Sequence, residues 1–150
     1  MEHTGSKPLE HDDSSGFAFA QEMLKGDPTS AVNMDRIQRH PEKGFIIFEY
    51  LLCEESQTVT PYTSHPRRYW HKNAQKFISL WEIAQKLEAA LYLVNYAKPG
   101  TVHADEILVI LVLGMDGNGI TEEKTWRTNR TKFSAWFRQL NRECLRSDGL

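Results

Sequence analysis

Residues 45–53 form an apolar segment with a single carboxylate, Glu49, at its centre. The segment, Phe-Ile-Ile-Phe-Glu-Tyr-Leu-Leu-Cys, is rich in aromatic and β-branched residues and therefore predicts a β-strand. Apolar residues occupy the positions one and two away from Glu49 on both sides, so neither face of this strand is polar there. Because an ionised carboxylate in such surroundings costs several kcal/mol unless it is compensated, we expect a cation or hydrogen-bond donors to face Glu49.

A second strand is expected directly upstream, over residues 33–40. The turn His-Pro-Glu-Lys-Gly at positions 40–44 follows it, and its proline and glycine favour a chain reversal. This upstream strand carries Asp35, which the hairpin would bring near Glu49. Two carboxylates that converge at a sheet are typical ligands of Mg²⁺, with Mn²⁺ as an alternative. The hairpin therefore predicts a metal site formed by Asp35 and Glu49.

The other segments predict one α/β domain over residues 17–150, preceded by a disordered tail over residues 1–16. The expected helices and strands are helices at 17–25, 73–87 and 131–146, and strands at 90–97 and 106–113. With the hairpin, this order predicts a mixed central sheet of about four strands flanked by three helices. Apolar spacing in the last helix predicts a buried stripe of Phe133, Trp136, Phe137, Leu140 and Cys144.

Charge is unevenly distributed along the chain. Residues 1–56 carry a net charge of −6 and residues 57–150 a net charge of +4. The loop at 58–73 interleaves basic and aromatic side chains, a combination that can hold phosphates and stack bases. The candidate nucleic-acid-binding residues of this loop are Arg67, Arg68, Tyr69, Trp70 and Lys72. The alternative is a surface loop whose aromatic rings pack on the domain.

Two cysteines, Cys53 and Cys144, lie in apolar patterns and are expected to be buried free thiols in a reducing compartment. The longest strongly apolar run, residues 107–113, is too short to span a bilayer, and the N-terminal residues do not resemble a signal peptide. We therefore expect a cytoplasmic protein that does not bind membranes.

The order of these elements resembles that of the PD-(D/E)XK nuclease superfamily. In that family a helix bearing Glu is followed by a strand bearing Asp, a strand bearing Glu and usually a lysine two residues later, a helix, and two more strands. Here Asp35, thirteen intervening residues and Glu49-Tyr-Leu51 look like the core of that motif. The resemblance covers about residues 17–114 and implies a restriction-endonuclease-like fold.

The resemblance implies a function and a set of roles. Asp35 and Glu49 would hold Mg²⁺, and Glu22 of the first helix would assist. Position 51 is Leu, so the usual lysine is missing; the resemblance nominates Lys72 or Lys76, at the start of the next helix, in its place. The implied activity is metal-dependent hydrolysis of DNA phosphodiester bonds, with a homodimer as one expected way of cutting both strands.

Three alternatives remain open at this point. The first is a catalytically inactive binding module on the same fold, which the absent lysine favours. The second is an accessory protein that acts through protein contacts and uses Tyr62, Tyr69 and Trp70 as anchors. In the third, both carboxylates are structural: Asp35 pairs with Arg36 or Arg39, and Glu49 pairs with Arg67 or Arg68.

Overall fold

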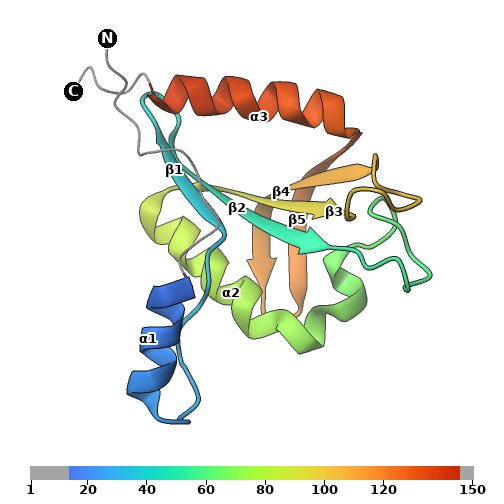
Figure 1. The fold of residues 1–150 in the computed structure, drawn as a ribbon. Helices are drawn as coiled ribbons and strands as arrows, with labels where there is room; N and C mark the ends of the chain where they lie inside the picture. Colours follow the sequence, from blue (N-terminus) through green and yellow to red (C-terminus); the bar gives the residue numbers. More distant parts are fainter. Residues whose placement is uncertain (1–13, 146–150) are drawn as a thin grey trace.

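The computed structural model describes residues 14–145 of the 150-residue chain, and a five-stranded mixed sheet lies at its centre. The strands are β1 (Arg36–His40), β2 (Gly44–Leu52), β3 (Ala90–Tyr96), β4 (Ile107–Asp116) and β5 (Gly119–Thr128). The helices are α1 (Ser14–Leu24), the 3₁₀ helix η1 (Pro66–Tyr69), α2 (Trp70–Leu87) and α3 (Arg130–Leu145). Figure 1 shows α3 above the sheet and α2 below it. Within the described part of the chain, no helix has both the length and the apolar content of a bilayer span.

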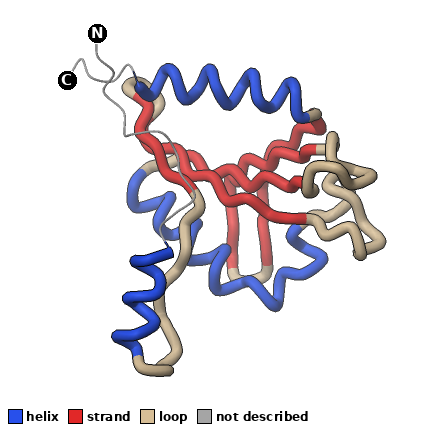
Figure 2. Tube along the Cα trace, in the orientation of Figure 1, coloured by secondary structure: helices blue, strands red, loops and turns tan. Residues whose placement is uncertain are grey.

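The strand order is β1-β2-β3-β4-β5, and only the β2–β3 pair is parallel. This pair is parallel because the chain crosses over through η1 and α2 between the two strands. The loops that follow β2 and β3 therefore lie together at one end of the sheet (Figure 2). Buried Asn95 of β3 holds the loop after β2 in place, because its Nδ2 donates hydrogen bonds to the carbonyls of Pro61 and Ser64, at 3.1 and 2.6 Å.

The expected mixed α/β domain with three α-helices is confirmed, but the sheet has five strands rather than four. The additional strand is β5, which pairs antiparallel with β4 through a turn closed by Asp116 and Gly119. Its sequence, Gly-Ile-Thr-Glu-Glu-Lys-Thr-Trp-Arg-Thr, is mostly polar because β5 is an edge strand with little buried surface. Hydrophobic periodicity therefore gave no strand signal there.

The ends of several helices and strands also differ from the predicted ones. Helix α1 begins at Ser14, so the prediction of a tail was wrong for residues 14–16, whereas residues 1–13 lie outside the described part. Strand β1 begins at Arg36, so Asp35 directly precedes the strand instead of lying within it. Helix α2 begins at Trp70, three residues earlier than expected, because η1 leads straight into it.

Each face of the sheet has its own apolar core. Towards α2, side chains such as Ile47 and Leu93 pack against Phe77 and Leu80 of the helix. Towards α3, Phe48 and Val109 belong to a second cluster with Leu140. Alternation along β2 therefore directs Ile47 and Glu49 towards α2, and directs Phe48 towards α3.

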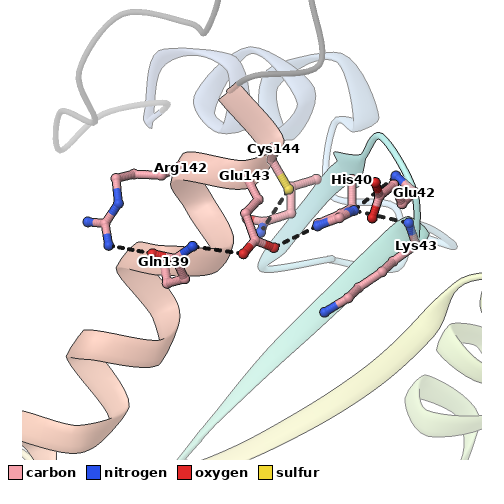
Figure 3. Close-up of polar contacts among 8 residues, drawn as sticks. His40, Glu42, Lys43, Gln139, Arg142, Glu143 and Cys144 are labelled. Carbon is pink, nitrogen blue, oxygen red and sulfur yellow. Dashed lines mark hydrogen bonds and ion pairs between the residues drawn. The ribbon is translucent and has the colours of Figure 1, made fainter.

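Buried His40 links helix α3 to the β1–β2 hairpin through hydrogen bonds (Figure 3). Its Nδ1 accepts hydrogen bonds from the backbone N–H groups of Glu42 and Lys43, both at 3.0 Å. The imidazole Nε2 lies 2.7 Å from Glu143 Oε1, so the neutral ring places its proton on Nε2 and donates it to that carboxylate. The pKa of Glu143 is lowered by hydrogen bonds from Gln139 and then from His40.

Helix α1 has no buried residue, and its apolar side chains Phe17, Phe19 and Met23 are exposed. Helix α1 therefore covers no core within residues 14–145.

Candidate functional site

Glu49 is fully buried on β2, on the face of the sheet that α2 covers. Strand register places it opposite Leu93 of β3, in the parallel part of the sheet. Its neighbours on the same face of β2 are Ile47 and Leu51, so the strand itself supplies no polar partner. Compensation for the carboxylate must therefore come from other elements.

The cation that compensates Glu49 is Lys76 of α2, whose Nζ forms an ion pair with Glu49 Oε2. Lys76 comes one position before the buried Phe77, at the border of the helix's apolar face. Its side chain remains 40% exposed, so the ammonium group lies between the buried carboxylate and solvent. The expected positive partner is thus present, and it is one of the two lysines that the family resemblance nominated.

Asp35 lies beside this pair. Its Oδ2 accepts a hydrogen bond of 2.8 Å from the backbone N–H of Tyr50, the residue after Glu49. Because Asp35 comes directly before β1, the hairpin carries it to the middle of β2. The two carboxylates are therefore brought together, as the hairpin predicted.

The pKa of Glu49 is raised above its ordinary value of 4.5, chiefly because burial removes water from the carboxylate. Lys76 opposes this effect by favouring the ionised form, and the charge of Asp35 reinforces it. No hydrogen bond from residues 14–145 reaches Glu49 Oε1. The carboxylate thus keeps a buried oxygen that could accept a further positive group.

These residues could hold a metal ion. No cluster of three or more His, Cys, Asp or Glu side chains with metal-binding geometry occurs among the described residues. Mg²⁺, however, is commonly held by one or two carboxylates together with water and substrate phosphates. Asp35 and Glu49, whose Oε1 accepts no hydrogen bond from the described residues, are the two carboxylates that could take part in such a site.

The other predicted members of the site are placed differently. Lys72 is exposed one helical turn before Lys76, so both lie on the same side of α2. Glu22 is exposed on α1, and it is not among the charged groups that act on Glu49. The structure therefore pairs Lys76 with Glu49 and places Lys72 one helical turn away, whereas Glu22 does not act on Glu49.

The predicted nucleic-acid-binding residues divide into two groups. Arg67 and Arg68 of η1 are exposed, and within the described chain neither forms an ion pair, so the expected pairing of one of them with Glu49 is wrong. Trp70 is only 3% exposed, and its indole N–H donates to the carbonyl of Gly117, so it is a core residue and cannot stack a base. Half-buried Tyr69 contacts Phe77, and burial raises its pKa to about 12.

The expected pairing of Asp35 with Arg36 or Arg39 is not seen either, because Arg36 instead donates hydrogen bonds to Gln38 and Asn141.

Two structural features could not be predicted from the sequence. One is the Tyr50 backbone N–H that holds Asp35, since a main-chain group leaves no mark in a residue pattern. The other is His65, which accepts from the Arg67 N–H through Nδ1 and contacts Glu123 of β5 through Nε2, thereby fixing the start of η1.

No protein-family model, curated protein or solved structure matches this chain. What the chain does must therefore be inferred from its own residues. Asp35, Glu49 and Lys76 are the group with the most specific chemistry.

Proposed function

We propose that this protein hydrolyses phosphodiester bonds of nucleic acid, DNA being the favoured substrate, with Mg²⁺ or Mn²⁺ held by Asp35 and Glu49. The observation that carries the proposal is the ion pair between Glu49 and Lys76 beside Asp35. The PD-(D/E)XK nucleases, which the sequence resembles, combine the same three groups. Here the lysine comes from the following helix instead of from position 51, where the chain has Leu.

A bound divalent ion would polarise a phosphate oxygen and lower the pKa of bound water. The chain's own residues have separate tasks. The Tyr50 N–H holds the carboxylate of Asp35 in place, and the apolar surroundings of Glu49 keep bulk water away from it. The Lys76 ammonium, which reaches solvent, would orient a phosphate oxygen or the attacking water.

Substrate binding is assigned to the basic start of the α2 region. Arg67, Arg68 and Lys72 are exposed there and lie before Lys76 in the chain. Cations in this arrangement attract a polyanion through its phosphates, without reading its sequence. This interaction predicts binding that weakens as salt is added.

One observation favours a second candidate, a nuclease-like module that binds nucleic acid but does not cut it. Lys76 forms an ion pair with Glu49, and an ion pair of this kind can be purely structural. The third candidate, an accessory protein anchored through aromatic side chains, loses support because its anchors are used inside the fold. Trp70 is buried, and the Tyr62 hydroxyl donates to the carbonyl of Thr128.

The test is nicking of supercoiled plasmid, single-stranded DNA and branched DNA with Mg²⁺ or Mn²⁺. We expect wild type to cut only with metal, and the isosteric Glu49→Gln variant to lose at least about a hundredfold in rate. Lys76→Met should lose a similar factor, because its ammonium acts at the reacting phosphate.

Lys86→Met is the matched control, since Lys86 is an exposed lysine in the last turn of the same helix. Its rate should equal that of wild type. Wild type that binds DNA but cuts none of the three substrates would favour the binding module. An equal loss of cutting rate in Lys76→Met and Lys86→Met would show that Lys76 does not act at the reacting phosphate.

Two further expectations accompany the proposal. Cutting both strands of a duplex would take two such sites, so we propose a homodimer on duplex DNA, to be measured by light scattering with and without DNA. Cys53 and Cys144 are both free thiols, which supports a reducing compartment such as the cytoplasm.

A further inference from the structure

The α3 face of the sheet holds a cavity of about 340 Å³ that the carboxylate site does not use. Aromatic side chains from three elements form its walls: Tyr92 of β3, Trp126 of β5, and Phe133 and Trp136 of α3. Glu49 and Lys76 belong to the opposite, α2 face. The cavity is therefore a separate feature of the molecule.

Two pairs of its rings meet at steep angles, and a third pair, Tyr92 and Trp126, has centroids 6.5 Å apart and planes at 36°. Tyr92 and Trp136 have centroids 5.4 Å apart with planes at 69°, and Phe133 and Trp136 are 5.7 Å apart at 58°. Trp126 is 45% exposed and Trp136 is 38% exposed, although the sequence predicted that Trp136 would be buried. Two tryptophans that leave this much ring surface open form an apolar patch that a ligand could cover.

The charges of the side chains around the cavity restrict the class of ligand that it can bind. No carboxylate lines the cavity, whereas the exposed Lys132 does and forms no ion pair within the described residues. Outside the cavity, exposed Lys124 and exposed Glu122 lie on the same side of β5 as Trp126, so their opposite charges add no net charge near the cavity. Arg127, in contrast, places its guanidinium over the ring of Tyr62, so it does not supply a free charge to the cavity.

An aromatic cage for a quaternary ammonium group would be surrounded by neutral or acidic side chains, whereas this cavity is lined by Lys132 and by no carboxylate. The size of the cavity is at the lower end of the range for small-ligand sites, which is about 300–1,000 Å³. Such a volume suits one planar ring system with a substituent. A planar ring with a phosphate attached is the chemistry that the aromatic walls and Lys132 together would recognise.

We infer that this cavity binds a single nucleotide, with the base between Trp126 and Trp136 and the phosphate at Lys132. The nucleotide could be a free nucleoside monophosphate or an unpaired unit of single-stranded nucleic acid. The inference does not rest on the proposed nuclease activity, because none of its residues belongs to the carboxylate site.

The test uses the full chain and titrates its tryptophan fluorescence with dAMP and, separately, with a short oligothymidylate. Isothermal calorimetry of the same samples gives the dissociation constants. We expect quenching in wild type, about tenfold weaker binding in Trp126→Ala, and a similar loss in Lys132→Glu. Arg138→Glu, an exposed position on another side of α3, is the matched control and should bind as wild type does.

Binding of dAMP would identify a free-nucleotide site, and binding of the oligomer alone would identify a site for an unpaired nucleotide; either result supports the inference. The inference is overturned if neither probe binds, if Trp126→Ala and Lys132→Glu bind as tightly as wild type, or if tetramethylammonium binds in their place. Glu49→Gln should keep its binding here, so failure of this site and failure of the nuclease proposal are distinguishable. Urea unfolding of each variant verifies that it is folded.

Discussion

Glu49 lies fully buried among apolar side chains, and among the described residues Lys76 is its ion-pair partner. The need for a cation follows from the sequence alone, since an apolar strand offers a carboxylate no compensation. Which of the two lysines pairs with Glu49 does not follow from the sequence. Lys72 and Lys76 lie on the same side of α2, so the choice depends on how far the helix is displaced along its axis relative to β2. That position is set by the burial of Phe77 and Leu80 against the sheet.

The raised pKa of Glu49 leads to a pH-dependent prediction. The folded protein holds the proton more tightly than the unfolded chain, where the carboxyl titrates near 4.5. The contribution of Glu49 to the free energy of unfolding is therefore full below pH 4.5 and is lost as pH rises through the raised pKa. Glu49→Gln cannot ionise, so its free energy of unfolding relative to wild type should increase from about pH 4.5 upward and then level off. Urea unfolding between about pH 4 and pH 8 measures this difference, and two parallel curves would contradict the prediction.

Asn95 supports a second prediction at this scale. Its Nδ2 donates to the carbonyls of Pro61 and Ser64, so Asn95→Ala should leave buried acceptors without a donor. We expect a loss of about 2–3 kcal/mol in the free energy of unfolding, measured in urea. Asn33→Ala is the control, because Asn33 is exposed, and it should change stability by less than about 0.5 kcal/mol.

Among the elements, the hairpin and the helices with strong apolar periodicity were predictable, whereas β5 and the exposure of α1 were not. Edge strand β5 buries too little surface to impose an alternating pattern on its sequence. The apolar side chains of α1 predict a buried face, yet no part of residues 14–145 covers them. In both cases the decisive fact is what lies next to the element, which its own residues do not encode.

The link between the β1–β2 hairpin and α3 can be tested through His40. His40→Ala removes an acceptor for two backbone N–H groups and a donor to Glu143, so we expect a loss of about 2 kcal/mol. Hydrogen exchange should accelerate at the turn and at the end of α3 in particular. His103→Ala, at an exposed histidine paired with Glu106 three residues away, should do neither. If hydrogen exchange instead accelerated uniformly over the whole domain, His40 would not act locally on the contact between the hairpin and α3.

For helix α1, in contrast to His40, we expect substitutions to change stability very little. Because Phe17, Phe19 and Met23 are exposed, replacing all three with Ala should change the free energy of unfolding by less than about 1 kcal/mol. Thermal unfolding followed by circular dichroism measures the effect. A loss of several kcal/mol would show that this helix is anchored through its apolar side chains after all.

At the scale of the whole molecule, the metal site proposed at Asp35 and Glu49 predicts linkage between metal binding and folding. Mg²⁺ at about ten times its dissociation constant should raise the free energy of unfolding of wild type by about 1.4 kcal/mol. Glu49→Gln should show no such increase, because it lacks one of the two carboxylates. The measurement is thermal unfolding with Mg²⁺ and, for ionic strength, with a matched concentration of NaCl. Equal stabilisation of both proteins would assign the effect to salt alone.

One edge of the sheet is β5, and an edge strand exposes unpaired N–H and C=O groups that another chain could extend. Along β5, the exposed side chains include Glu122, Lys124 and Arg127. Charges on an edge make pairing with a second identical strand costly, since they would have to be desolvated or brought next to like charges. The polar side chains of β5, which are the reason that its sequence gave no strand signal, therefore also protect the protein against aggregation through sheet extension.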